Sequence, residues 1–285
     1  MKLNLDCIPC FQRQALQAIR FVSEDEKVHE RVIRDVMKRL LELEWDSTPP
    51  GLAREVHALV RRYTGGGDPY RKVKEDSNHE ALRLYDEMKA IVEQSDDQIV
   101  TAARIAIAGN IIDFGAVQEY DLEETISDVL SREFAIDDSP EFKQRLSRAG
   151  SILYFLDNAG EIVFDKLFAE TLASNADIEA IDFVVKGGPI LNDATMEDAK
   201  MVGLDEIPGA AFRKITNGEP GTGPPRLSDE VRSWIAGHDL TISKGQGNYE
   251  EMSEYRDIFF LLIAKCPLIA SDVSVDIRDI VFKST

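Results

Sequence analysis

The amino-acid sequence predicts an α/β fold: a Rossmann-like, mostly parallel sheet domain over residues 145–285, preceded by an all-helical domain over residues 1–144. Three observations support this prediction. The first half places apolar residues three and four positions apart, which is the helical period. The second half contains short apolar runs rich in β-branched and aromatic residues. Stretches of helical period separate several of these runs, as in a parallel sheet that is buried on both faces.

The individual elements follow from these patterns and from the residues that interrupt them. Helices are expected over residues 11–21, 28–43, 52–63, 78–94 and 97–109. Pro49 or Pro50 can open the third of these helices, because proline fits the first helical turn. Strands are expected over residues 151–156, 181–185, 212–215, 240–242 and 259–263, with helices over residues 162–174 and 229–235 between them.

Composition narrows the classes of protein to which the chain can belong. Its 285 residues, 44% of them hydrophobic, can form two cores or one large core. The net charge of −19 disfavours binding to nucleic acid and to anionic membrane surfaces. No apolar run approaches the roughly 20 residues of a membrane helix, and the N-terminal residues lack a signal-peptide pattern. We therefore expect a cytoplasmic protein, and the three cysteines do not form a disulfide framework.

Polar, glycine-rich segments follow each of the predicted strands. Ligands of open parallel sheets bind beyond the carboxyl ends of the strands, so these segments are the candidate site. Any one of them alone would be an ordinary turn, but several that converge on one sheet edge indicate a site. The segments after the first, second and fourth strands contribute Asp157, Asn158, Glu161; Lys186, Gly187, Gly188, Asn192, Asp193; and Lys244, Gly245, Gln246, Gly247, Asn248.

The residue types in these segments suit a cation and an anion together. Asp157, Asn158 and Asp193 offer hard oxygen donors, which suit Mg²⁺, Mn²⁺ or a similar ion. Lys186 and Lys244 can hold phosphoryl oxygens, and the glycines let backbone N–H groups approach an anion. Asp198 falls in a predicted helix beyond Asp193 and is expected to have no part in the site. From the residues alone, the prediction is a metal and anion site.

Five motifs in this sequence resemble those of the damage-control phosphatase family, also known as domain of unknown function 89, in its compact archaeal and bacterial branch. They are LDCIPC at residues 5–10, AGNIIDFG at 108–115, LDNAGE at 156–161, VKGGPILNDAT at 185–195 and SKGQGNYE at 243–250. The resemblance implies metal-dependent hydrolysis of a small phosphorylated metabolite, with Mn, Co, Ni or Mg as the divalent metal ion. The arginine- and threonine-containing C-terminal signature of the sugar-phosphate branch is not apparent, so that substrate class is not carried over.

The resemblance also assigns roles to particular residues. It implies that Asp157, Asn158 and Asp193 are the metal ligands. It implies that Asn110 and Asp113, which follow a predicted helix, bind the substrate. For Cys7 and Cys10 three roles stay open: packing or a reversible disulfide, a role beside the active site, or metal binding. No second CxxC and no nearby histidine completes a zinc site.

Two other functions compete with this reading. A nucleotide- or S-adenosylmethionine-dependent transferase would also use a Rossmann-like domain, but no GxGxxG follows the first strand. A non-catalytic metabolite or metal sensor has no DNA-binding feature to support it. An aspartyl nucleophile of the haloacid-dehalogenase type is a variant of the phosphatase reading. That class places a second Asp two residues after the first, and position 159 is Ala.

Overall fold

The computed structural model describes residues 1–63, 65–110, 128–216, 225–226 and 228–285. Its centre is a seven-stranded sheet in the order β1-β7-β6-β5-β2-β3-β4. The strands are parallel except for the antiparallel pair β6–β7. The predicted mostly parallel sheet is thus confirmed. Its strands are β1 (Ile136–Asp137), β2 (Ser151–Phe155), β3 (Ala180–Lys186), β4 (Ala210–Ile215), β5 (Leu240–Lys244), β6 (Ile258–Ile263) and β7 (Ile280–Ser284).

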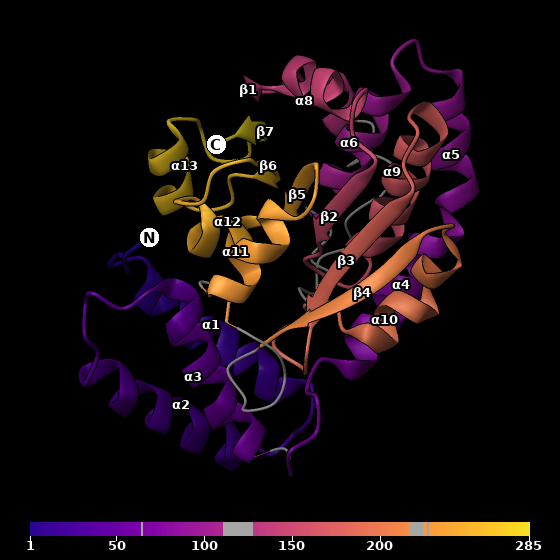
Figure 1. Ribbon diagram of the computed structural model, residues 1–285. Helices are drawn as coiled ribbons and strands as arrows, with labels where there is room; N and C mark the ends of the chain where they lie inside the picture. Colours follow the sequence, from indigo (N-terminus) through magenta and orange to yellow (C-terminus); the bar gives the residue numbers. More distant parts are fainter. Residues whose placement is uncertain (64, 111–127, 217–224, 227) are drawn as a thin grey trace.

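Helices cover both faces of this sheet (Figure 1). Successive side chains of a strand point to opposite faces, so each strand contributes to two cores. Ile152, Tyr154 and Phe183 face one core, whereas Leu153 and Val184 face the other. The first face packs against α4 (Arg71–Arg83), α5 (Tyr85–Gln94), α6 (Gln98–Gly109), α8 (Ser139–Leu146), α9 (Glu161–Asn175) and α10 (Met196–Met201). The second packs against α11 (Asp229–Ala236), α12 (Gln246–Met252) and α13 (Pro267–Val273).

The first three helices form a body with a core of their own. They are α1 (Cys7–Arg20), α2 (Glu26–Leu41) and α3 (Pro49–Arg62). Phe11, Ile19, Val36 and Val56 are among the residues that pack in this third core. Pro49 opens α3 as the sequence predicts, and the side chain of Thr48 accepts a hydrogen bond from the N–H of Gly51. The domain boundary at residues 144/145 stays a prediction; in the packing, α4, α5 and α6 join the core of the sheet.

Three departures from the sequence-based elements are plain. The helix expected over residues 78–94 is two helices, α4 and α5, which meet at Leu84, where the N–H donates to the carbonyl oxygen of Ala81 three residues back. The strand β7 and the two-residue β1 were not predicted. The short helices α12 and α13 begin within segments whose glycine and proline residues predict loops. Among the described residues, no helix combines the length and the apolarity needed to cross a membrane.

Candidate active site

The loops after β2 and β3 lie against each other at the carboxyl edge of the sheet. Because β2 and β3 pair in parallel, their loops open on the same edge. The N–H of Ala194 donates to the carbonyl oxygen of Asp157 at 2.7 Å, and the N–H of Ala159 donates to that of Asn192 at 2.9 Å. Asn158 and Asp193 form an isolated antiparallel bridge. These bonds place Asp157, Asn158 and Asp193 together, as the sequence predicts.

The loop after β5 comes close to the same carboxylate. Gly245 has a φ of +76°, which an L side chain rarely adopts. A Cβ at this position would lie 1.8 Å from Oδ2 of Asp157, inside any permitted contact. Position 245 therefore requires glycine for two independent reasons. The absence of a side chain there lets the strand-end loops of β2 and β5 meet.

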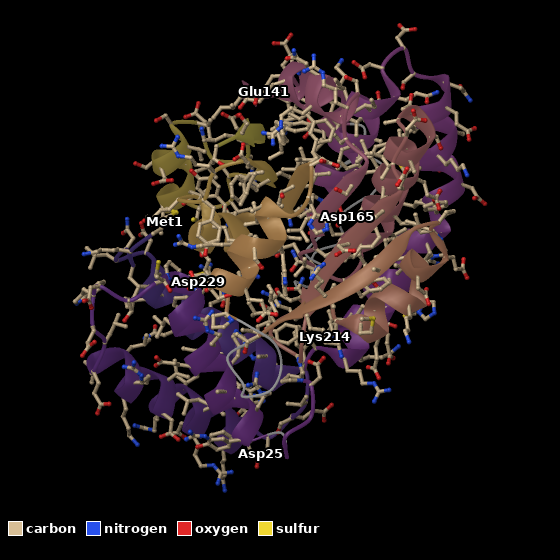
Figure 2. The ribbon with its side chains drawn as sticks, viewed as in Figure 1. Met1, Asp25, Glu141, Asp165, Lys214 and Asp229 are labelled. Carbon is tan, nitrogen blue, oxygen red and sulfur yellow. The ribbon has the colours of Figure 1, made fainter. Side chains whose placement is uncertain are left out.

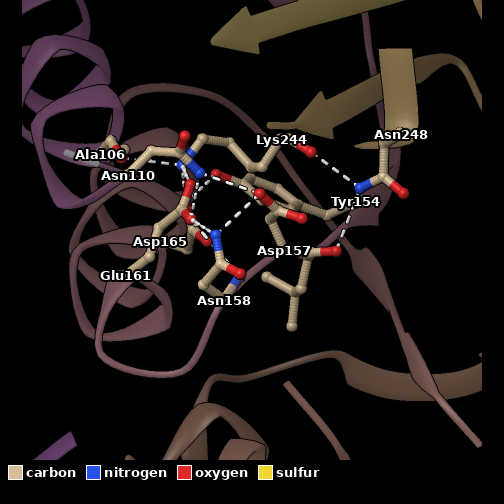
Figure 3. Close-up of polar contacts among 10 residues, drawn as sticks. Ala106, Asn110, Tyr154, Asp157, Asn158, Glu161, Asp165, Lys244 and Asn248 are labelled. Carbon is tan, nitrogen blue, oxygen red and sulfur yellow. Dashed lines mark hydrogen bonds and ion pairs between the residues drawn. The ribbon is translucent and has the colours of Figure 1, made fainter. Parts of the chain in front are cut away.

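Two side-chain amides orient Asp157 and also bond the carboxylate of Glu161 (Figure 3). Asn110, which follows α6, donates through Nδ2 to Asp157 Oδ2 at 2.9 Å and to Glu161 Oε2 at 2.6 Å. Asn158 Nδ2 donates to the same two oxygens at 2.9 and 3.2 Å. Glu161, the first residue of α9, is fully buried. The four side chains form one hydrogen-bonded network.

The two predicted lysines have different surroundings. Lys186 Nζ lies 3.1 Å from Asp193 Oδ2 and lines a cavity, so it faces the place where a ligand would bind. Lys244 is fully buried, and its Nζ donates to Glu161 Oε1 at 2.8 Å, Asp165 Oδ1 at 2.6 Å and the carbonyl oxygen of Ala106 at 2.8 Å. An ammonium group has three N–H donors, so these partners use all of them. Lys244 thus lies behind the carboxylates, and a direct bond to phosphate would cost one of these three hydrogen bonds.

The carboxyl groups of the site lie close together, and their ionised forms repel one another even though Lys186 pairs with Asp193. Burial raises the pKa of Asp157 well above its usual range, and the nearby charges of Glu161 and Asp193 raise it further. Burial also raises the pKa of Asp193 to about 8. A bound cation would remove this repulsion. Hard oxygen donors with excess negative charge fit a divalent cation such as Mg²⁺ or Mn²⁺.

The site opens into a cavity of about 220 Å³ between the α1–α3 body and the sheet edge. Asp157, Lys186 and Asp193 line it on the side of the sheet. Most of the remaining wall is apolar, with Phe11, Pro49, Pro50, Ala53, Ile190, Leu191, Pro267 and Leu268. Cys7, Cys10 and Cys266 are free thiols, and all three line the same cavity. Their position brings the CxxC motif beside the candidate site.

The other predicted site residues are distributed around this centre. Gln246 and Gly247 line the cavity. The Gln246 side chain also accepts a hydrogen bond from the backbone of Lys265, at 2.6 Å. Asn248 Nδ2 donates to the carbonyl oxygens of Leu156 and Lys244, at 3.1 and 2.7 Å, so it ties β2 to β5.

Gly187 and Gly188 lie beside the cavity and not in its wall. Gly187 and Gly188 line a neighbouring hollow, and the N–H of Gly187 already donates to the carbonyl oxygen of Ile215 at 2.8 Å. That N–H is therefore not free for an anion in this arrangement. Asp113 lies outside the described residues.

Several residues of the site carried no recognisable signal in the sequence. Asn78 of α4 is fully buried and accepts a hydrogen bond from the N–H of Gly160 at 2.6 Å, so it fixes the loop after β2. Arg54 and Arg226 line the cavity. Only the fold brings these residues to the site, since they belong to other helices or loops.

The expectation that Asp198 lies apart from this structure is wrong. Its carboxylate accepts from Lys74 Nζ at 3.0 Å and from Asn78 Nδ2 at 3.2 Å. It also accepts from the Thr195 hydroxyl at 2.7 Å, which caps α10. Asp198 is therefore a buried support of the loop that carries Asp193. A neutral control for that loop has to come from an exposed position.

In the described part of the chain, no group of three or more His, Cys, Asp or Glu side chains is arranged as a metal centre. The candidate ligands Asp157, Asn158 and Asp193 are not such a group, because one of the three donors is the amide of Asn158. Asp157 and Asp193 supply the charge, and the amide supplies a neutral oxygen. The residues present therefore fit a hard cation, with few protein ligands and room for water and substrate.

Comparisons with known proteins agree on one family. The model of the damage-control phosphatase ARMT1-like domain matches residues 3–281. A protein from Archaeoglobus fulgidus named damage-control phosphatase is 35% identical, with 99% of each chain covered. An uncharacterized protein from Methanocaldococcus jannaschii is 36% identical over 98% of this chain and 94% of its own. The crystal structure of a DUF89 family protein from Pyrococcus horikoshii superposes with a TM-score of 0.86 at 31% identity, over 100% of this chain and 99% of that one.

Proposed function

Because the chain belongs to the damage-control phosphatase ARMT1-like family, we propose that it is a metal-dependent phosphatase that hydrolyses a small phosphorylated metabolite. The observation that carries this proposal is the pair Asp157 and Asp193. They lie in the loops after two adjacent strands, on the wall of a cavity; Asp157 is buried and Asp193 is partly buried, and both have raised pKa values. A bound cation would favour the ionised form of both groups at a place where a phosphate ester can also bind.

The residues of the chain take separate roles in this proposal. Asp157, Asn158 and Asp193 would hold the divalent cation, which when bound neutralises phosphoryl charge and acidifies the attacking water. Lys186 would bind a phosphoryl oxygen from the same wall. Asn110 and Glu161 hold Asp157 and Asn158 in position. Lys244 compensates the charge of Glu161 and Asp165 from behind.

The test is hydrolysis of p-nitrophenyl phosphate by the purified protein before and after exhaustive chelation. We expect EDTA to abolish hydrolysis and Mn²⁺, Co²⁺, Ni²⁺ or Mg²⁺ to restore it. Asp193→Asn should keep the fold and lower turnover by orders of magnitude, since it removes one charge from the ligand set. Asp205→Asn is the control, because Asp205 is exposed. Activity that survives chelation, or full activity in Asp193→Asn, would refute the metal site.

A nucleotide- or S-adenosylmethionine-dependent transferase has no comparable support. Asp157 and Glu161 are buried where a pyrophosphate would approach the first helix after β2, and their charge opposes such a ligand. Metal identity, the physiological substrate and the cytoplasmic location stay predictions.

A further inference from the structure

Arg226 is a buried cation on the wall of the cavity. Only 7% of the residue is exposed. Its Nη1 donates to the carbonyl oxygen of Gly247 at 3.2 Å and to Glu251 Oε2 at 2.8 Å. Its Nε is buried and has no hydrogen-bond partner in the part of the chain that the structure describes. A buried N–H without a partner is destabilising, so a ligand oxygen that reached this edge of the guanidinium would satisfy it.

A second arginine, Arg54, shares the carboxylate of Glu251 with Arg226, so the two guanidinium groups carry more positive charge than this carboxylate neutralises. Arg54 of α3 also lines the cavity, and its Nη1 donates to Glu251 Oε1 at 2.7 Å. Two guanidinium groups thus share one carboxylate. Glu250 lines the cavity as well, but burial and the charge of Glu251 raise its pKa to about 7, which weakens its opposing charge near neutral pH. The wall around Arg226 therefore favours an anion.

This arginine pair lies away from the candidate metal ligands. Gly245 contacts Asp157 just before α12, whereas Glu251 lies near the end of that helix. Arg226 bonds Gly247 and Glu251, two and six residues beyond Gly245, so at a rise of 1.5 Å per residue its partners lie about 3 to 9 Å from Gly245 along the helix axis. The cavity that joins them is walled mainly by apolar side chains, including Phe11, Ala53 and Leu268. A ligand that reaches both ends needs a spacer with apolar character.

We propose that Arg226, supported by Arg54, binds a second anionic group of the substrate. The substrate is then a phosphomonoester whose far end carries a carboxylate or another phosphate beyond an apolar spacer. The inference rests on the proposed phosphatase function, with the first phosphate at the metal site. Guanidinium groups bind such anions through two parallel N–H bonds, and Nε is one donor of that pair.

The experiment compares substrates that differ only in the second anion. Propyl, butyl, pentyl and hexyl phosphate are matched with the same esters bearing a terminal carboxylate, and with the corresponding terminal bisphosphates. The variant is Arg226→Lys, which keeps a cation beside Glu251 but lacks the Nε edge. The control is Arg232→Lys, because Arg232 is exposed on α11. Thermal unfolding of each variant verifies the fold.

We expect the wild type to show a KM about tenfold lower for a two-anion ester than for its plain alkyl partner at one spacer length. If the carboxylate esters show this lower KM, the second anion is a carboxylate; if the bisphosphates show it, the second anion is a phosphate. Arg226→Lys should lose the gain, so that its KM for the two-anion ester rises to that for the alkyl ester, and Arg232→Lys should retain it. Equal KM values for the two ester types at every length in the wild type, or a gain that is retained in Arg226→Lys, would overturn the second subsite. No hydrolysis of any ester would instead refute the phosphatase function.

Discussion

At the scale of single residues, Gly245 occupies a position where any side chain would collide with Asp157. The glycine combines a left-handed φ of +76° with a space that a methyl group cannot enter. The carboxylate oxygen that blocks this space is the one that Asn110 and Asn158 hold. The position of Asp157 is thus determined from three sides, by two amides and by one backbone.

We predict that Gly245→Ala reduces metal-stimulated hydrolysis by at least a hundredfold. The added methyl group would displace Asp157, and the strained backbone would cost about 1–3 kcal/mol of the free energy of unfolding. Hydrolysis rates at saturating metal, together with chemical denaturation, measure both effects. Gly150→Ala is the control, because its Cβ would meet its nearest atom at an ordinary 3.7 Å. Wild-type activity in Gly245→Ala would show that Asp157 does not need its present position.

Some residues of the site can be predicted from the sequence, whereas the positions of others depend on partners that are distant in sequence. Asp157, Asn158 and Asp193 follow apolar strands, so their position at one sheet edge is predictable from the parallel fold. Lys244 also follows a strand, but it turns inward to pair with Glu161 and Asp165 on a different element. The direction of a side chain at a strand end depends on partners that are distant in sequence. For the same reason Asn78 and Arg226 could not be found from local patterns.

At the scale of elements, Lys244 joins three of them. It lies at the end of β5, contacts Glu161 and Asp165 on α9, and reaches the carbonyl oxygen of Ala106 on α6. Tyr154 of β2 completes the cluster by donating to Asp165 at 2.8 Å. Asp165 lies in the interior, whereas Asp25 and Glu141 extend from the outer rim (Figure 2). The buried charges thus hold the sheet and its helical layer in a defined relation.

We predict that Lys244→Met lowers the free energy of unfolding by about 3–5 kcal/mol, because it leaves two buried carboxylates without their cation. Denaturant unfolding at neutral pH measures the change. Lys283→Met on β7 is the control, since Lys283 is only partly buried. Adding Asp165→Asn to Lys244→Met should restore part of the loss. A stability change in Lys244→Met no larger than in the control would show that Lys244 does not support the fold.

Strands and helices could be predicted where their apolar residues formed a run long enough to show a strand or helix pattern. The five predicted strands match β2 to β6 within two residues at each end. β1 has two residues and takes its strand character from β7 alone, which local sequence does not reveal. α12 and α13 are short and begin at glycine or proline segments, which are also typical of turns. Their helical form depends on packing against the second face of the sheet.

At the scale of the whole molecule, acidic groups outnumber basic ones by 52 to 33. Several of the acidic groups that face the cavity or the buried network have raised pKa values. Burial is the largest cause for Asp157, for Asp193 (about 8), for Asp165 (about 7) and for Glu250 (about 7). The folded, metal-free protein therefore holds protons that the unfolded chain has already released above about pH 5.

We predict that the melting temperature of the metal-free protein falls as the pH rises from 5.5 to 8.5. A carboxyl group with a raised folded-state pKa contributes stability below its unfolded pKa and loses it as the pH passes the folded value. Bound metal should cancel much of this fall, since it stabilises the ionised ligands. Melting curves in EDTA and in excess Mn²⁺ test both statements. Parallel pH dependences with and without metal would contradict the assignment of Asp157 and Asp193 as ligands.

The place of β7 in the sheet has a consequence for the order in which the molecule can be completed. β7 comes last in sequence, yet it lies between β1 and β6 and pairs with both. During synthesis, β6 can join β5 as soon as both have emerged, but β1 must wait for a strand made more than a hundred residues later. The central strands and their loops can thus assemble on a growing chain. The sheet closes on β1 only after residues 280–284 leave the ribosome.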